Sequence, residues 1–206
     1  TEFSSLEGIM GHIYAQEEGI DQDIANSLKD YYHPRYSDDR LPEGELGTVL
    51  ALADRVDTVY GLFSIDLKPK RSSDPYALRR MSIGIIRILW ENEIPLPLDE
   101  LIESAEKAHK YKASRDELHS FLLTRLEQYL KDTYQKKSKL DTPLIQAVVN
   151  NTSKQLNTKK TILAQIEKDS ESKEFTLITE FAKRVFNIAI KGKQRGTFQL
   201  SEKLMN

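Results

Sequence analysis

Apolar residues recur along this chain at intervals of three and four positions, which is the spacing of an amphipathic α-helix. The pattern predicts helices at roughly residues 4–16, 21–32, 43–63, 74–91, 99–112, 114–134, 143–151, 159–168 and 173–190. Turn-forming residues separate several of these segments, as in the stretch HPRYSDDRLP at residues 33–42. No alternating strand pattern competes with this interpretation, so we expect an all-α fold.

The segment at residues 74–91 combines two apolar faces with three arginines. Asp74 can cap the helix, and Pro75 suits its first position, where no backbone N–H is needed. Apolar residues on both faces predict a helix inside a helical domain: Leu78, Met81, Ile85 and Leu89 on one face, and Ile83, Ile86 and Trp90 on the other. A buried arginine needs a partner, because an unpaired buried charge costs several kcal/mol.

Polar stripes on two neighbouring segments suggest that partner. Small or polar residues share one face of the 43–63 helix: Gly47, Ala51, Asp54, Thr58 and Gly61. Arg80, Gly84, Arg87 and Glu91 form a similar stripe on the 74–91 helix. Small residues allow two helices to approach closely, so we expect the stripes to pack together. Asp54 would then form a structural ion pair with Arg80 or Arg87.

Charge is distributed unevenly along the chain. Residues 1–66 hold 14 acidic and 4 basic side chains, a net charge of −10, whereas residues 67–206 hold 18 acidic and 26 basic ones, a net charge of +8. A nucleic-acid contact should therefore fall in the later part, although a solvated surface of uneven charge explains the same numbers.

Four cations gather around the start of the 74–91 helix, and we call them the basic edge: Lys68, Lys70, Arg71 and Arg79. A helix N-terminus with nearby cations suits a phosphate group, so we expect this edge to contact an RNA backbone. The alternative is a solvated basic loop. The basic helices after residue 131 are a second place where RNA could bind.

Composition narrows the possible classes of protein. Hydrophobic residues make up 39% of the chain and charged residues 30%, which favours a packed core over disorder. The absence of cysteine excludes disulfides and thiolate sites and fits a reducing compartment, so we expect a cytoplasmic protein. No apolar run approaches 18 residues and no signal peptide is visible, which predicts no membrane association. The first residue is Thr1 without an initiator methionine, and we expect a fragment of a longer protein.

Motifs for catalysis or metal binding are missing from the sequence. The four histidines do not fall into H-E-x-x-H or a comparable ligand spacing, and no His-Asp dipeptide occurs. No glycine-rich phosphate loop and no G-x-S-x-G elbow is present. Asp54 and Asp57 could share a cation at their i, i+3 spacing, but two carboxylates alone are a weak signal. We therefore expect no catalytic residue and no metal or cofactor in this chain.

Several strings resemble a known family, the β subunit of the bacterial-type heterotetrameric glycyl-tRNA synthetase. They are TEFSSLEGIMG, LPEGELGTVLALADRVDTVYGLF and SSDPYALRR, which span residues 1–90 in the family's order. The later FLLTRLEQYL and EFAKRVFNIAI resemble the same family more loosely. The resemblance implies a fragment from the middle and later part of a longer subunit, without the family's C-terminal anticodon-binding domain.

That resemblance also implies a function and partners. In the family, the α subunit carries the class II aminoacylation site and uses ATP and Mg²⁺, while the β subunit is needed for activity and supplies much of the tRNA binding. This chain would support tRNA(Gly) binding and α2β2 assembly, would have no catalytic site of its own, and would be inactive alone.

Part of the family's β subunit is similar to HD-type metal-dependent phosphohydrolases. The string ALADRVD resembles the last motif of that fold, with Asp54 at its aspartate position, but the paired His-Asp step is absent. The resemblance implies an HD-like helical domain at residues 1–112, truncated at its N-terminus, followed by a helical extension at residues 113–206.

Two other functions stay open at this point. An active HD-type phosphohydrolase would use Asp54 as a metal ligand and needs a histidine cluster near it. A helical protein-interaction module would use the acidic first third of the chain as its docking face.

Overall fold

The computed structural model describes residues 6–70, 73–134, 140–170 and 172–194. These ranges are helical, which confirms the all-α prediction; the only bridged backbone pair in them is isolated and joins Lys70 to Ser73. The helices in chain order are α1 (Ile9–Glu17), α2 (Gln22–Asp30), α3 (Glu45–Ser64), α4 (Leu78–Glu91), α5 (Leu98–Ala108), α6 (Arg115–Tyr134), α7 (Thr142–Val149), α8 (Leu156–Asp169) and α9 (Lys173–Gln194).

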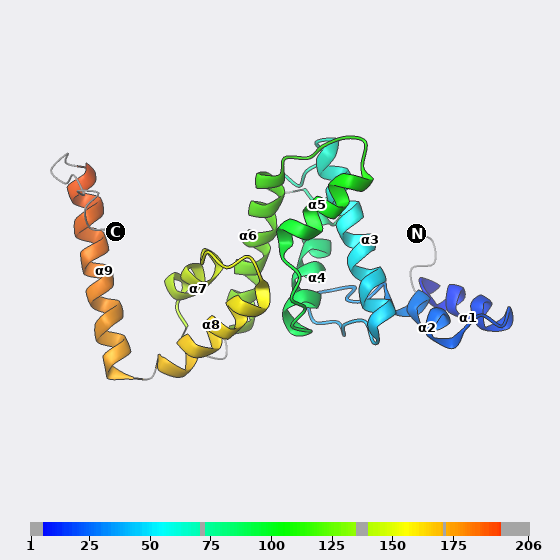
Figure 1. Cartoon of the computed structure of the whole chain (residues 1–206), viewed down its shortest axis with the longest axis horizontal. Coiled ribbons are helices and arrows are strands. Elements are labelled where there is room, and N and C mark those ends of the chain that lie inside the picture. Colours follow the sequence, from blue (N-terminus) through cyan, green and yellow to red (C-terminus); the bar gives the residue numbers. More distant parts are fainter. Residues whose placement is uncertain (1–5, 71–72, 135–139, 171, 195–206) are drawn as a thin grey trace.

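Neighbouring helices pack in a chain of contacts along the molecule. α1 pairs with α2, α2 packs on α3, and α3 contacts both α4 and α5. α6 lies on α4 and α5, and the pair α7 and α8 continues the stack, with α8 reaching back to α4. Figure 1 shows α9 standing apart from this stack. The long helices α3, α4 and α6 thus form the centre of the fold.

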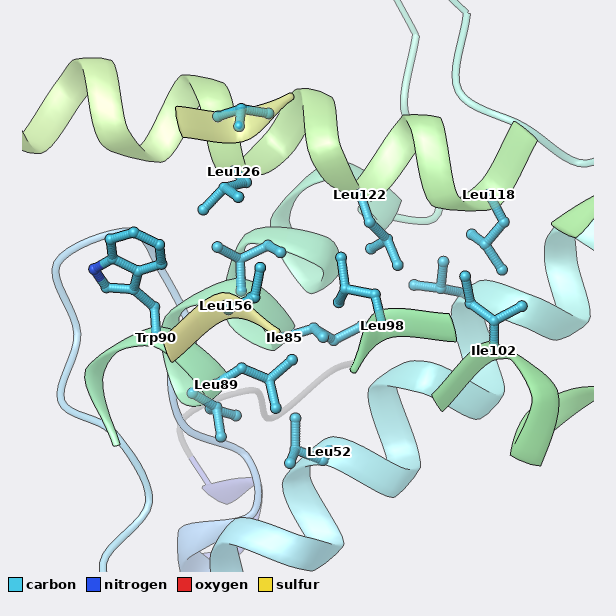
Figure 2. Packing of buried hydrophobic residues seen from close by; sticks show 14 of the residues in the cluster. Leu52, Ile85, Leu89, Trp90, Leu98, Ile102, Leu118, Leu122, Leu126 and Leu156 are labelled. Atoms are coloured by element: carbon cyan, nitrogen blue, oxygen red, sulfur yellow. The ribbon is translucent and has the colours of Figure 1, made fainter. Parts of the chain in front are cut away.

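The hydrophobic core lies between these central helices. Figure 2 shows Leu118, Leu122 and Leu126 on one face of α6, pointing into the cluster that contains Ile85 of α4 and Ile102 of α5. Each of these four side chains is at most 3% exposed. Leu156 of α8 belongs to the same cluster as the residues of α3, α4 and α5. The core therefore contains residues from both sides of position 112. The expected division of the chain into two domains at that position stays a prediction.

The start of α4 differs from the sequence prediction by three residues. Ala77 adopts a left-handed backbone conformation with φ 55°, so regular helix begins only at Leu78 and not at Pro75. Asp74 still caps the helix, because its carboxylate accepts hydrogen bonds from the backbone N–H groups of Leu78 and Arg79, both at 2.9 Å. The cap was correctly placed, and the turn between cap and helix was missed.

The predicted ion pair of Asp54 with Arg80 or Arg87 is wrong. Asp54 and Arg80 are both exposed, whereas Arg87 is buried and pairs with Glu91 one turn later, with 2.7 Å between Nε and Oε1. No ion pair of Asp54 is found in the described ranges. The reason is the rotation of α3, which turns the next residue, Arg55, toward α4.

Arg55 is the buried cation between α3 and α4. It is 6% exposed, and a Cβ atom added to Gly84 would lie only 2.8 Å from its Nε atom. Its guanidinium donates hydrogen bonds to the backbone carbonyls of Tyr31 at 2.9 Å, Tyr32 at 2.9 Å and Pro34 at 3.2 Å. Burial lowers the pKa of Arg55, and the charges of Asp54 and Asp39 oppose that effect.

The 31–44 loop, which joins α2 to α3, is held by Arg87 as well. Arg87 donates to the Asp39 backbone carbonyl at 2.8 Å. The Asp39 carboxylate accepts from the backbone N–H of Arg35 at 2.6 Å and lies 2.7 Å from His33 Nδ1. Two buried guanidinium groups therefore fix the backbone of this loop against α3 and α4.

The small-residue stripe on α3 has a different partner from the predicted one at its first position. A Cβ added to Gly47 would lie 3.0 Å from Asp30 Cβ, so this glycine faces α2 and not α4. Gly84 does allow α3 and α4 to approach closely, as expected.

Within the described residues, no helix combines the length and the apolar character that crossing a bilayer requires.

Candidate nucleic-acid interface

The basic edge lies where the loop after α3 leads into α4. Lys68 and Lys70 stand in that loop, and Arg79 is the second residue of α4. Arg71 lies outside the described residues. The isolated backbone bridge between Lys70 and Ser73 closes the loop and brings the lysine close to the helix start. The structure therefore assembles three of the four expected residues within one short segment.

Lys68 is the least suited of these residues to bind a phosphate. Its ammonium lies 2.8 Å from the Asp66 carboxylate and 2.7 Å from that of Glu117 on α6. The hydrogen bonds that its ammonium donates to Asp66 and Glu117 raise the pKa of Lys68, so its charge is retained but compensated. A phosphate would have to displace two carboxylates to reach this lysine.

Lys70 and Arg79 are more available. The Lys70 side chain is exposed, and its backbone carbonyl accepts a hydrogen bond from the Arg79 guanidinium. That contact fixes the arginine beside the loop. Asp74 occupies the backbone N–H groups at the helix start, so the cationic side chains, and not the free helix N-terminus that the sequence suggested, are what could attract an anion.

Arg125 of α6 is a cation near this edge that the sequence analysis missed. Its guanidinium carbon lies 5.4 Å from the centroid of the Phe121 ring, and its Nε atom is buried without a hydrogen-bond partner in the described part of the chain. Burial and then the nearby charge of Arg79 lower the pKa of Arg125. Two guanidinium groups that repel each other are a favourable site for an added anion.

The pairing of Arg125 with Arg79 depends on tertiary structure. Periodicity predicts the α6 helix and its buried leucines, and the Phe121 to Arg125 spacing of four residues places both on one face. The sequence does not reveal that this face meets the start of α4. Arg80 is exposed on α4 beside these residues and lines a surface pocket together with Asp74 and Arg79.

The residues that an HD-type hydrolase would need are not brought together in the described structure. Asp54 and Asp57 are both exposed on α3, and Asp57 lies 2.8 Å from His109 Nε2. Among the described residues, no group of three or more His, Cys, Asp or Glu side chains is placed to hold a metal ion. The alternative of a metal-dependent phosphohydrolase therefore gains no support from the geometry.

The fold and this surface define an all-α protein whose candidate site is a cationic edge. Residues 1–150 match the family described as glycyl-tRNA synthetase beta subunit. The chain belongs to that family, which is a family of ligases among the aminoacyl-tRNA synthetases.

Three relatives illustrate the similarity, and each is named Glycine–tRNA ligase beta subunit. The protein of Shouchella clausii is 38% identical over 211 residues, which cover 98% of this chain and 29% of the relative. That of Methylobacillus flagellatus is 44% identical over 135 residues, covering 64% and 19%. That of Nitrosomonas eutropha is 50% identical over 104 residues, covering 50% and 14%. The chain thus spans less than a third of the length of these relatives.

Proposed function

We propose that this chain supports tRNA binding and α2β2 assembly in the ATP-dependent charging of tRNA(Gly) with glycine. The observation that carries the proposal is the group of cations at the start of α4, where Arg79 and Arg80 line one pocket, the Lys70 carbonyl holds the Arg79 guanidinium, and the charge of Arg79 acts on Arg125. Such a surface suits the phosphate backbone of RNA. Family membership supplies tRNA as the RNA in question.

In this proposal the chain has a binding role and no catalytic one. Glycine activation, with ATP and Mg²⁺, belongs to the α subunit, as the family resemblance implies. The described residues of the candidate site offer guanidinium and ammonium groups, and none of them pairs a nucleophile with a base. Its contribution to the reaction would be to hold tRNA in a fixed orientation, which lowers the entropic cost of the charging step.

A kinetic separation tests the proposal in the assembled enzyme. Replacing Lys70 and Arg79 together by alanine should raise the KM for tRNA about tenfold or more, because charge-assisted phosphate contacts are lost. Glycine-dependent ATP–pyrophosphate exchange, which needs no tRNA, should be unchanged. If the variant charges tRNA with the wild-type KM, the assignment of this surface to tRNA is wrong.

Co-purification tests the assembly part of the proposal. A tagged subunit that contains this chain should retain an untagged α subunit through affinity and size-exclusion steps. This chain alone, supplied with glycine, ATP and Mg²⁺, should form no glycyl-adenylate. Measurable activation by the chain alone would contradict the non-catalytic role.

A further inference from the structure

A surface pocket opens where the 31–44 loop meets the first turns of α4. It encloses about 480 Å³, which is within the range of about 300–1,000 Å³ for small-molecule sites. Its lining includes Tyr36 and Ser37 of the loop and Arg79, Arg80 and Gly84 of α4. The pocket therefore combines an aromatic ring, a hydroxyl group and two guanidinium groups next to the basic edge. Asp74 also lines it, with its carboxylate accepting hydrogen bonds from the backbone N–H groups of Leu78 and Arg79.

Hydrogen bonds hold the loop backbone around Tyr36, whereas the Tyr36 side chain is exposed to solvent. Arg55 binds the Pro34 carbonyl, and Arg87 binds the Asp39 carbonyl, on either side of Tyr36. The Tyr36 residue is nevertheless 57% exposed. An exposed ring on a rigid loop is a prepared stacking surface, because little conformational entropy is lost when a planar group binds to it.

The first turn of α4 provides the two cations of the pocket, Arg79 and Arg80. Arg80 is exposed, and no described residue forms an ion pair or hydrogen bond with its guanidinium. Arg79 is anchored by the Lys70 carbonyl and also lines the pocket. Two arginines that line the same pocket as an aromatic residue match a ligand that carries both a planar ring and an anionic group.

We propose that this pocket binds one unpaired nucleotide of an RNA, with its base stacked on Tyr36 and its phosphate held by Arg80 and Arg79. The proposal rests on the tRNA-binding function and names the kind of RNA element that the chain recognises. A paired base inside a helix cannot present its face to a side chain, so the ligand must be a single-stranded end, loop or bulge.

The test uses this chain and two labelled RNA probes of equal charge. One probe is a single-stranded tetranucleotide, and the other is the same backbone with every base removed. Stacking on an aromatic side chain is worth about 1–3 kcal/mol per base, so the first probe should bind about 5- to 150-fold more tightly. Tyr36→Ala should abolish that preference, and Tyr36→Phe, which keeps the ring, should retain it.

A second variant separates the phosphate contact from stacking. Arg80→Ala should weaken both probes by the same factor and flatten the salt dependence of binding by a slope of about 0.7 for one lost phosphate contact. Thermal melting of all three variants checks that each is folded, and both substituted residues are exposed.

Three outcomes would overturn the pocket assignment: equal affinity of the wild type for both probes, no binding of either probe at low salt, or an unchanged base preference in Tyr36→Ala. None of these decides the broader function, because contacts along the basic edge to a tRNA backbone require no exposed base. That broader function fails separately, if replacing basic-edge residues leaves tRNA affinity and its salt dependence unchanged.

Discussion

Arg55 shows how a guanidinium can be buried without a carboxylate. Its hydrogen bonds to the carbonyls of Tyr31, Tyr32 and Pro34 satisfy a donor group that presents a planar fork of N–H bonds. Arg87 combines one such carbonyl contact with an ion pair to Glu91. Both residues thereby couple the 31–44 loop to the central helices and fix the wall of the proposed nucleotide pocket.

Removing this clamp should destabilise the protein strongly. Arg55→Met keeps most of the apolar stem but leaves buried carbonyls without a donor, each at about 1–3 kcal/mol. We expect the free energy of unfolding in urea to fall by about 3 kcal/mol or more. Arg80→Met on exposed α4 surface is the matched control and should stay within about 0.5 kcal/mol of wild type. Equal losses in the two variants would contradict the assigned role of Arg55.

Asp39 should make the loop sensitive to acid. Burial alone would raise its pKa, but hydrogen bonds from the Arg35 backbone N–H and from His33 hold the pKa below its usual 3.8. Because the folded-state pKa is depressed, Asp39 stabilises the fold above about pH 4, and this contribution is lost as the pH falls through the folded pKa.

The Asp39→Asn variant isolates that contribution. It should be less stable than wild type at pH 7. The difference in the free energy of unfolding should shrink as the pH is lowered toward 3, because protonation of this carboxyl in the unfolded wild-type chain then favours unfolding. Urea unfolding at pH 7, 5 and 3 measures both proteins in parallel. A difference that is constant over this range would argue against a stabilising carboxylate at this position.

Sequence periodicity identified the buried arginine helix but not the partners of its arginines. The polar stripes predict Asp54 as the partner of the arginines, because helical periodicity relates only residues on helix faces to one another. Arg55 and Arg87 donate most of their hydrogen bonds to backbone carbonyls of the loop. A backbone acceptor cannot be identified from the sequence, because every residue carries one. The sequence also does not show that Lys68 is paired, because its partner Glu117 is 49 residues further along the chain and only tertiary structure brings the two together.

At the scale of elements, the close approach of α3 and α4 depends on a single missing side chain. A Cβ added to Gly84 would lie 2.8 Å from Arg55 Nε and 3.6 Å from Pro34 Cγ. The Arg55 side chain cannot easily move aside, because its hydrogen bonds to the loop fix it. The gap between the helices therefore leaves little room for even one methyl group.

Gly84→Ala is consequently expected to destabilise the fold. Alanine favours helix over glycine by about 1 kcal/mol, but overpacking of a close contact costs about 1–3 kcal/mol and displaces the Arg55 clamp. We expect a net loss of about 1–2 kcal/mol in chemical unfolding. Three other glycines are unsuitable as controls. A Cβ added to Gly61 would lie 2.8 Å from His109, and Gly19 and Gly44 have a positive φ that strains any other residue. Gly11→Ala, with its nearest contact at 3.9 Å, is the matched control and should be neutral or stabilising. A more stable Gly84→Ala would contradict the close-packing account.

The positions of the helices were largely predictable, since nine expected segments overlap the helices of the described chain. Errors fall at the ends, where local conformation decides. Asp74 caps α4 as the sequence predicts. The regular helix begins at Leu78 and not at Pro75, because Ala77 adopts a left-handed conformation. Alanine rarely adopts that conformation, so no sequence signal marks it. Ser114 lies at the start of α6 and accepts a hydrogen bond from the Glu117 backbone N–H at 3.4 Å.

At the scale of the whole molecule, the core joins the two expected regions. Leu118, Leu122, Leu126 and Leu130 of α6 are 0–3% exposed and complete the cluster around α4. In contrast, the apolar residues Leu177, Ile178 and Phe181 of α9 are about two-thirds exposed. The first group of residues should be essential for folding, and the second should not.

Two truncated chains test this contrast. Residues 1–112 alone should lack a cooperative thermal transition, because each leucine that α6 no longer supplies removes about 1.5–3 kcal/mol of burial. Residues 1–170, which lack α9, should melt within about 2 °C of the full chain. Circular dichroism at 222 nm follows both transitions. A cooperative, native-like transition for residues 1–112 would instead support an independent domain ending there.

The account's central claim is that the cations at the start of α4 contact the tRNA backbone. Lys70 and Arg79 are the basic-edge residues best placed to do so, and their joint replacement by alanine should remove phosphate contacts. Lys29 of α2 and Lys107 of α5 are exposed cations that do not belong to the basic edge, and their joint replacement is the matched control for the change in net charge.

The most direct measurement is the slope of log affinity for tRNA(Gly) against log salt concentration, in the assembled α2β2 enzyme. Each lost phosphate contact should flatten this slope by about 0.7–0.9, so Lys70→Ala with Arg79→Ala should reduce it by about 1.5. The Lys29→Ala, Lys107→Ala control should keep the wild-type slope. If the two double variants show the same slope as wild type, the start of α4 does not contact the tRNA backbone, and the account is contradicted.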